Sequence, residues 1–333
     1  MINQQTLRAV LLVDHGVSLV EMSGPLQTFA TVNDLTAGAR GYATSVVSVD
    51  GGLVYTSCGQ QIMTEPIASA RQAPIDTLIV LGGCAGEDFT VRPRQIAELA
   101  LTAPLARRVC SLGTGIFALA AAGQIGQRRV AAHWHYAPVL QARYPSMQID
   151  AKRIFLRDGA VWTSAGLVAS FDLVLALVEQ DYGHAMALAA ARQLIMFIKR
   201  SGLQAQVSVP LELQAASDWM FADLHAWIAA HLHDDLSIAR LAEKVCMAPR
   251  TFARTYSERI GRTPAKTVEA MRLEAACREL ENPSIPLKSV ASRVGLLSEQ
   301  AMQRAFKRVY GVSPSQYRAT HYQPGHSLAR QAA

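Results

Sequence analysis

Four polar side chains near the start of one amphipathic segment, Glu299–Tyr310, are suited to hydrogen-bond with the edges of nucleic-acid bases. In a helix over this segment, Met302, Phe306 and Val309 would form one buried apolar stripe. The side chains that would point outward are Glu299, Gln300, Gln303 and Arg304. In the major groove of DNA, glutamine pairs with adenine, arginine with guanine, and glutamate with the amino group of cytosine. The segment therefore has the residue types of a helix that reads base sequence.

Two cations, Lys307 and Arg308, follow in the same segment and are expected to contact phosphates, which position a protein on DNA without specifying its sequence. A helix over Leu287–Val294 is expected to precede the segment, because Gly295 is typical of a helix end and Ser298 of an N-cap. Two helices joined by such a short turn form a helix-turn-helix, whose second helix enters the major groove.

The same plan occurs upstream. Ser237 would cap a helix over Ile238–Val245, and a short turn leads to a second helix, Pro249–Ile260, whose proline suits the first helical position. Phe252 and Tyr256 are four residues apart and would face the core. The outward residues near the start of this helix, which we predict to contact DNA, are Arg250, Thr251, Ala253 and Arg254.

A long helix, Pro264–Leu280, is expected to join the two units. At about 1.5 Å per residue it spans roughly 25 Å. With its flanking turns, this length can set the two reading helices near one turn of DNA apart, about 34 Å. Ordinary helix packing is the alternative for either unit alone, but two units with matching stripes and a common spacer favour double-stranded DNA as the partner.

The run RVGLLSEQAMQRAFKRVYGVSPSQYR closely resembles the signature of the AraC/XylS family, through Phe306-Lys307, Gly311–Pro314 and Tyr317-Arg318. The upstream unit is similar to the family's first unit, although Ala248 stands where a serine cap is usual. The resemblance implies a sequence-specific transcription regulator, usually an activator, that reads a bipartite promoter site with both helices and acts on RNA polymerase.

The N-terminal half contains a second arrangement associated with chemistry. Residues 109–123 read VCSLGTGIFALAAAG, which predicts a strand, a sharp glycine-containing turn and a helix. This is the architecture of a nucleophile elbow, in which one residue sits in a strained turn beside a helix N-terminus. Exposed backbone N–H groups at such a turn would favour an anion such as a carboxylate.

Together with His133-Trp134 and Trp162–Gly166, the elbow resembles the class I glutamine-amidotransferase-like fold of the PfpI superfamily. The whole chain resembles GlxA-type regulators, which fuse that fold to an AraC-type DNA-binding domain. The resemblance implies a cysteine at the elbow, but Gly113 stands there, and glycine supplies no nucleophile. We therefore predict no catalytic residue and a sensor that binds a metabolite. The alternative is an amidase- or hydratase-type enzyme whose nucleophile is Cys84 or Cys110.

The predicted ligand site combines the elbow, the glycine pair after one strand, and the positions of the superfamily's acid and base. Its residues are Glu21, Gly82, Gly83, Cys84, Gly113, Thr114, His133, Trp134 and Trp162. An aromatic face suits a cationic group, so an amino-acid-like or quaternary-ammonium effector is expected by family analogy. Core packing is the favoured alternative for Trp162. His133 and His135 lack an evident third ligand, so neither a metal nor another cofactor is expected.

Near-continuous apolar strands alternate with helices over the first 200 or so residues, which indicates a parallel sheet covered on both faces. The expected strands are Ala9–Val13, Thr44–Val49, Thr77–Leu81 and Arg108–Ser111, and the expected helices Pro25–Val32, Pro93–Leu101 and Gly115–Ala122. The predicted organisation is a flavodoxin-like α/β sensing and dimerisation domain over 1–205, a linker over 206–216, an all-α DNA-binding domain over 217–320 and a flexible tail over 321–333.

Composition agrees with a globular two-domain protein: of 333 residues, 50% are hydrophobic and 17% charged. No signal peptide or membrane-spanning run is evident, and the five cysteines are scattered, as in the reducing cytoplasm. From Ser217 onward, 16 Lys and Arg face 11 Asp and Glu, a net charge of +5, whereas the preceding residues carry only +1. The positive charge is thus concentrated in the predicted DNA-binding part.

Overall fold

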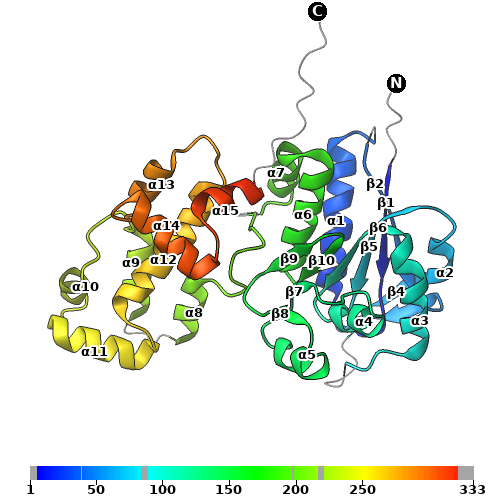
Figure 1. Ribbon diagram of the computed structural model, residues 1–333, viewed down its shortest axis with the longest axis horizontal. Coiled ribbons are helices and arrows are strands. Elements are labelled where there is room, and N and C mark those ends of the chain that lie inside the picture. Colours follow the sequence, from blue (N-terminus) through cyan, green and yellow to red (C-terminus); the bar gives the residue numbers. More distant parts are fainter. Residues whose placement is uncertain (1–5, 39, 84–88, 197–198, 217–220, 322–333) are drawn as a thin grey trace, which may run out of the picture. The chain divides into compact units, whose positions relative to one another are not determined.

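The computed structural model describes residues 6–38, 40–83, 89–196, 199–216 and 221–321 (Figure 1). The chain divides into two compact units between Gln206 and Val207. The first is an α/β unit and the second is helical, which confirms the predicted fold class. The predicted tail after His321 and Cys84 both lie outside the described residues.

Eight of the described strands form the sheet of the first unit, in the order β3-β4-β2-β1-β5-β6-β10-β9. The strands from β4 to β10 in this order pair in parallel, whereas β3 and β9 are antiparallel edge strands. A separate parallel pair is formed by β7 and β8. The bounds are β1 Leu7–Leu12, β2 Tyr42–Ser48, β3 Gly52–Tyr55, β4 Gln61–Pro66, β5 Ile75–Leu81, β6 Ala106–Leu112, β7 Arg129–Ala131, β8 Gln148–Asp150, β9 Phe155–Asp158 and β10 Val161–Ser164.

Helices cover both faces of this sheet, so its central strands are apolar on both sides. In β1, Ala9 and Leu11 belong to the core shared with α1, α6 and α7, whereas Val10 and Leu12 belong to the core shared with α3, α4 and α5. The helices are α1 Leu19–Leu35, α2 Ile67–Ala70, α3 Pro93–Thr102, α4 Gly115–Ala121, α5 Ala137–Arg143, α6 Ala169–Tyr182 and α7 His184–Gln193, with a short 3-10 helix at Ala103–Leu105. The predicted start of α1 at Pro25 was wrong, because Pro25 lies inside the helix.

The second unit contains both predicted helix-turn-helix units. Its helices are α8 Val209–Ala216, α9 Ala222–Ala230, α10 Ile238–Lys244, α11 Pro249–Ile260, α12 Pro264–Leu280, α13 Leu287–Arg293, α14 Glu299–Tyr310 and α15 Pro314–His321. The bounds predicted for α11, α12 and α14 are confirmed. Helix α12 packs against helices of both helix-turn-helix units.

Local capping explains these bounds. The Ser237 hydroxyl accepts a hydrogen bond from the Arg240 N–H at 3.4 Å, and the Ser298 hydroxyl accepts one from the Ala301 N–H at 3.1 Å. Helices α11 and α14 both end at a glycine in the left-handed conformation, Gly261 with φ 74° and Gly311 with φ 75°. The predicted caps Ser237 and Ser298 thus set the starts of α10 and α14, and the two glycines set the ends of α11 and α14.

Aromatic residues form the core of each helix-turn-helix unit. Phe252 and Tyr256 are fully buried in the first unit, and Met302 and Phe306 in the second. The prediction that Val309 completes the second stripe was wrong, because its side chain is 54% exposed. The rings of Tyr310 and Tyr317 lie 5.0 and 5.6 Å from that of Phe306 and fill the core beside the last turn of α14.

The segment predicted as a linker contains a helix. Val209 and Leu213 of α8 are spaced four residues apart, and Leu213 is fully buried in the same core cluster as Phe252 and Tyr256. The structure therefore differs from the prediction of an irregular connection over 206–216, because α8 packs as part of the helical unit.

Within the described residues, no helix combines the length and apolarity needed to cross a membrane.

Candidate nucleic-acid interface and elbow site

The first group of predicted base-contacting residues lies on the outer face of α11. Arg250, Thr251 and Arg254 are exposed, and Ala253 is partly buried. Arg254 reaches Glu258 at 4.0 Å, an exposed pair that contributes little to stability. No ion pair among the described residues engages Arg250, so its guanidinium group remains available to an external partner.

The second group lies on the outer face of α14. Gln300, Gln303 and Arg304 are exposed, whereas Glu299 is partly buried. The Gln303 amide donates a hydrogen bond to Glu299 Oε1 at 3.3 Å, so these two side chains are paired in the free protein. Both helices thus present polar side chains near their N-termini, where a helix in the major groove meets base edges.

The cations of the second unit divide into two groups. Lys307 and Arg308 are exposed on α14, and Arg308 also forms an ion pair of 2.6 Å with Glu269 of α12. In contrast, Arg272 donates to the carbonyl oxygens of Leu232 and Asp234, both at 2.9 Å, and Arg318 also donates to backbone carbonyls. Arg272 and Arg318 therefore stabilise loops, and the net positive charge overstates the number of side chains free to contact phosphates.

The elbow has the predicted backbone path: β6 ends at Leu112, a turn follows, and α4 begins at Gly115. Gly113 has φ +51°, in the left-handed region that side chains other than glycine rarely adopt. A Cβ atom built at Gly115 would lie only 2.8 Å from the carbonyl carbon of Val80, so the backbone at Gly115 is closely packed against Val80. The strained turn of a nucleophile elbow is therefore present without its usual side chain.

The Glu21 carboxyl group occupies the space where a side chain at Gly113 would begin. A Cβ atom built at Gly113 would overlap Glu21 Oε1 and lie 2.9 Å from Glu21 Cδ. A Cβ atom at Gly166 would overlap the same oxygen, so two glycines make room for one carboxyl group. The sequence predicted that Gly113 leaves space for a bound anion; in the structure an acidic side chain of the protein fills it.

Glu21 is held by one backbone contact. The Leu167 N–H donates to Glu21 Oε1 at 2.7 Å, and the side chain is only 5% exposed. Burial raises the pKa of Glu21 from 4.5 to about 7, and the hydrogen bond from Leu167 offsets only part of this effect. Near neutral pH the group therefore exchanges between its neutral and charged forms.

Replacing Glu21 with glutamine is expected to remove a pH dependence of folding stability. The pKa of Glu21 is higher in the folded chain than in the unfolded chain. Its contribution to the free energy of unfolding is therefore fully present below about pH 4.5 and is lost as the pH rises through about 7. At about pH 9 the Glu21→Gln variant should be more stable than the wild type by about 3 kcal/mol, and at about pH 5 the difference should fall to about 1 kcal/mol or less. Urea unfolding at both pH values measures this.

The control is Glu65→Gln, which makes the same chemical change at an exposed position of β4. Equal destabilisation by Glu21→Gln at both pH values would show that the charge of Glu21 is not the cause.

The predicted glycine pair serves close backbone packing. A Cβ atom at Gly82 would lie 2.5 Å from the Thr114 carbonyl carbon, and one at Gly83 would lie 2.9 Å from the His15 carbonyl carbon. Thr114 itself is buried. Gly82 thus brings the end of β5 against the elbow turn, whereas Gly83 packs on the loop after β1.

The other predicted ligand-site residues lie in two places. The Trp162 side chain is in the core, with its ring 6.4 Å from that of Phe155 and 5.1 Å from the Arg157 guanidinium group, which agrees with the favoured alternative of core packing. Trp134 is 54% exposed, and its ring stacks 5.5 Å from that of His133. Burial and the neighbouring His135 lower the pKa of His133, which favours its neutral form.

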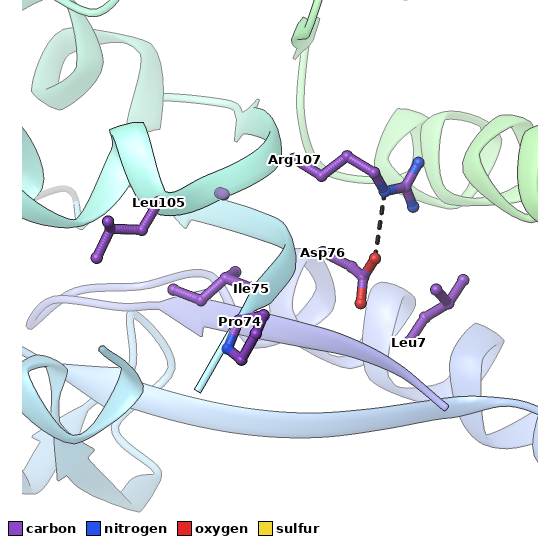
Figure 2. Close-up of a pocket in the computed structure, with 7 residues that line it drawn as sticks. Leu7, Pro74, Ile75, Asp76, Leu105 and Arg107 are labelled. Carbon is purple, nitrogen blue, oxygen red and sulfur yellow. Dashed lines mark hydrogen bonds and ion pairs between the residues drawn. The ribbon is translucent and has the colours of Figure 1, made fainter. Parts of the chain in front are cut away.

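A cavity of about 410 Å³ lies elsewhere in this unit, at the amino ends of β1, β5 and β6 (Figure 2). The elbow is at the opposite, carboxyl end of β6. Figure 2 shows Arg107 and Asp76 facing one another across this cavity, where they form an ion pair of 3.2 Å. The lining residues are Leu7, Pro74, Ile75, Asp76, Leu105, Ala106 and Arg107.

Sequence reasoning missed the loop that holds Glu21. Gly166 has φ +93° and Leu167 has φ +51°, so two consecutive residues are left-handed, and Leu167 donates the hydrogen bond to Glu21. The glycine of the WTSAG run was a visible signal for such a turn, but not for its contact with α1. Within the described part of the chain, no group of three acidic, histidine or cysteine side chains is arranged to hold a metal ion.

Comparison with known families gives one match to each unit. The DJ-1/PfpI family model matches residues 7–180, and a helix-turn-helix domain model matches residues 241–320. A solved ThiJ/PfpI family protein from Pseudomonas syringae has a similar fold, with a TM-score of 0.51 and 21% identity over 59% of this chain and 78% of that one. A solved AraC family transcriptional regulator from Pseudomonas putida has a TM-score of 0.50 and 20% identity over 56% of this chain and 99% of that one.

Three curated relatives match most of the chain. The HTH-type transcriptional regulator GbdR of Pseudomonas aeruginosa is 26% identical over 306 residues, 91% of this chain and 82% of that protein. CdhR of the same species is 27% identical over 84% of this chain and 82% of its own length. GlxA of Rhizobium meliloti is 26% identical over 86% and 87%, respectively. The similarity therefore spans both units in one order.

Proposed function

Since the chain belongs to the DJ-1/PfpI family and joins that domain to an AraC-type helix-turn-helix domain, as GlxA-type regulators do, we propose that it is a transcription regulator controlled by a small molecule. Its relatives GbdR, CdhR and GlxA are HTH-type transcriptional regulators. The observation that carries the DNA-binding function is the pair of exposed polar faces on α11 and α14, each backed by a buried aromatic core.

The expected binding site is double-stranded promoter DNA with two half-sites, one for each reading helix. Arg250 of α11 and Arg304 of α14 are the leading candidates for base contacts, and Lys307 for a phosphate contact. Purified full-length protein should protect two adjacent segments of one promoter from nuclease digestion. Protection of one segment only would contradict reading by both helices, and no sequence-specific protection would contradict the function itself.

We propose that the elbow is not catalytic in this chain. Nucleophilic catalysis needs a thiolate or alkoxide in the turn, and Gly113 provides neither, while Glu21 fills the space beside it. Cys110, the described cysteine nearest in sequence, is fully buried, and burial raises the pKa of its thiol to about 12. Of the two cysteines considered as the nucleophile of an amidase- or hydratase-type enzyme, this leaves Cys84, which lies outside the described residues.

The effector is proposed to bind at the elbow through Glu21. A carboxyl group whose pKa lies near 7 favours a cationic group beside it, since a cation stabilises the charged form. An amino-acid-like or quaternary-ammonium metabolite carries such a group. The first unit is also proposed to form the homodimer, and effector binding to alter how the DNA-binding units engage the promoter and RNA polymerase.

A thermal-shift screen of amino acids and quaternary ammonium compounds tests the effector. At 100 times its Kd, a specific ligand is expected to stabilise the chain by about 2.7 kcal/mol. Its affinity should increase as the pH rises through about 7, because binding then requires less release of a proton from Glu21. The Glu21→Gln variant should bind weakly at every pH. A ligand whose stabilisation is unchanged in this variant would place the binding site elsewhere.

A further inference from the structure

The two helix-turn-helix units differ by one residue in the turn before the reading helix. In each unit the first helix is followed by a left-handed residue, Cys246 with φ 54° or Gly295 with φ 74°. The next N–H donates back to the first helix: Met247 N–H to the Ala242 carbonyl at 2.9 Å, and Leu296 N–H to the Ala291 carbonyl at 2.8 Å. The two turns are equivalent up to this point.

Beyond it they diverge. In the first unit the N-cap of α11, Ala248, follows Met247 directly. In the second unit Leu297 lies between Leu296 and the N-cap Ser298. Leu297 is therefore the additional residue of the second turn.

This additional residue is apolar, and its side chain is not buried in the fold. Leu297 is 99% exposed, whereas its neighbour Leu296 is partly buried. A fully exposed leucine gains no stabilisation from burial in its own chain. It lies directly before the N-cap of α14, beside the turn that carries Glu299 and Gln300. An apolar side chain is thus presented at the end of the helix that is proposed to enter the major groove.

On the basis of the proposed DNA-binding function, we propose that Leu297 contacts the C5-methyl group of a thymine in the second half-site. Thymine alone among the four bases presents a methyl group in the major groove, and apolar side chains recognise it by contact. Leucine has no hydrogen-bonding group in its side chain, so it has no other means of distinguishing bases. The exposed Arg304 and Lys307 of the same helix add positive charge that attracts DNA to α14.

The test removes that methyl group from the DNA. Full-length protein first selects its binding site from random duplex DNA, and each thymine of the selected site is then replaced in turn by deoxyuridine. At one position of the second half-site, the wild-type affinity should fall roughly fourfold, the effect of one buried methyl group. Leu297→Ala should show nearly equal affinity for the thymine and deoxyuridine duplexes at that position.

Val309→Ala is the matched control, because Val309 is also an exposed apolar residue of α14 but lies in its last turn. This variant should keep the wild-type response to deoxyuridine, and both variants should unfold at the wild-type temperature. The contact would be overturned if no replacement of thymine by deoxyuridine lowered the affinity of the wild type. It would also be overturned if Leu297→Ala lost as much affinity as the wild type on that replacement. A loss of promoter activation with unchanged DNA affinity would overturn it as well, and would assign Leu297 to a protein partner. Failure to select any DNA site would instead overturn the proposed function.

Discussion

Replacing Arg304 with alanine is expected to lower the affinity of the chain for its specific DNA site by roughly 5- to 100-fold, the usual effect of losing one bidentate contact between arginine and guanine. Arg304 is exposed in the second turn of α14, and no ion pair among the described residues engages it. Arg250→Ala should have an effect of similar size, because Arg250 lies in the first turn of α11. Equilibrium binding to specific and unrelated duplexes at one salt concentration measures both effects.

The comparison variant is Arg278→Ala. Arg278 is an arginine of α12 that pairs with Glu274 at 3.8 Å, so this change removes one positive charge away from the reading helices. It should leave the ratio of specific to non-specific affinity unchanged, whereas the two variants above should lower that ratio. If Arg250→Ala and Arg304→Ala both kept the wild-type ratio, α11 and α14 would not be the helices that read the bases.

Introducing a thiol at the elbow, by Gly113→Cys, is expected to destabilise the first unit by about 2–5 kcal/mol. A side chain in the left-handed conformation costs about 1–2 kcal/mol, and forcing atoms into filled space about 1–3 kcal/mol. Both apply here, because Gly113 has φ +51° and its Cβ atom would overlap the Glu21 carboxyl group. Urea unfolding followed by a signal from the first unit measures the loss.

Two further variants separate the causes. Gly123→Cys introduces the same side chain at φ +70°, where nothing lies within 4 Å, and should show the backbone cost alone. Adding Glu21→Ala to Gly113→Cys should recover the part of the stability that is lost through overlap with the Glu21 carboxyl group. If Gly113→Cys were as stable as the wild type and its thiol reacted rapidly with an electrophile, the elbow would accept a nucleophile, and the enzymatic alternative would regain support.

The sequence was most informative where one residue type determines a local conformation. Pro249 suits the first position of α11 and Ser298 the N-cap of α14, and both helices begin where these residues predicted. The exposed faces of α11 and α14 followed from the same bounds. These signals act within a few residues, which is the range over which a sequence pattern is decisive.

The predictions that failed depend on contacts between residues far apart in the chain. Val309 has the spacing of a buried residue, but the tyrosines beside Phe306 close the core before it. The position of Glu21 against Gly113 and Gly166 joins α1 to two loops after strands, and no local pattern shows that a carboxyl group fills the elbow. The helix α8 was overlooked because its burial depends on partners from α11.

The continuous helix between the two helix-turn-helix units has a consequence for promoter architecture. Helix α12 is 17 residues long and packs against both units, so it leaves the spacing of the two reading helices little freedom. Because the connection is rigid, the two half-sites of the DNA must keep a fixed rotational position relative to one another on the double helix. Inserting about five base pairs between them, half of a 10–10.5 base-pair turn, would move one half-site to the opposite face of the DNA. In promoters that respond to this protein, half-site sequences can therefore vary more readily than the distance between them.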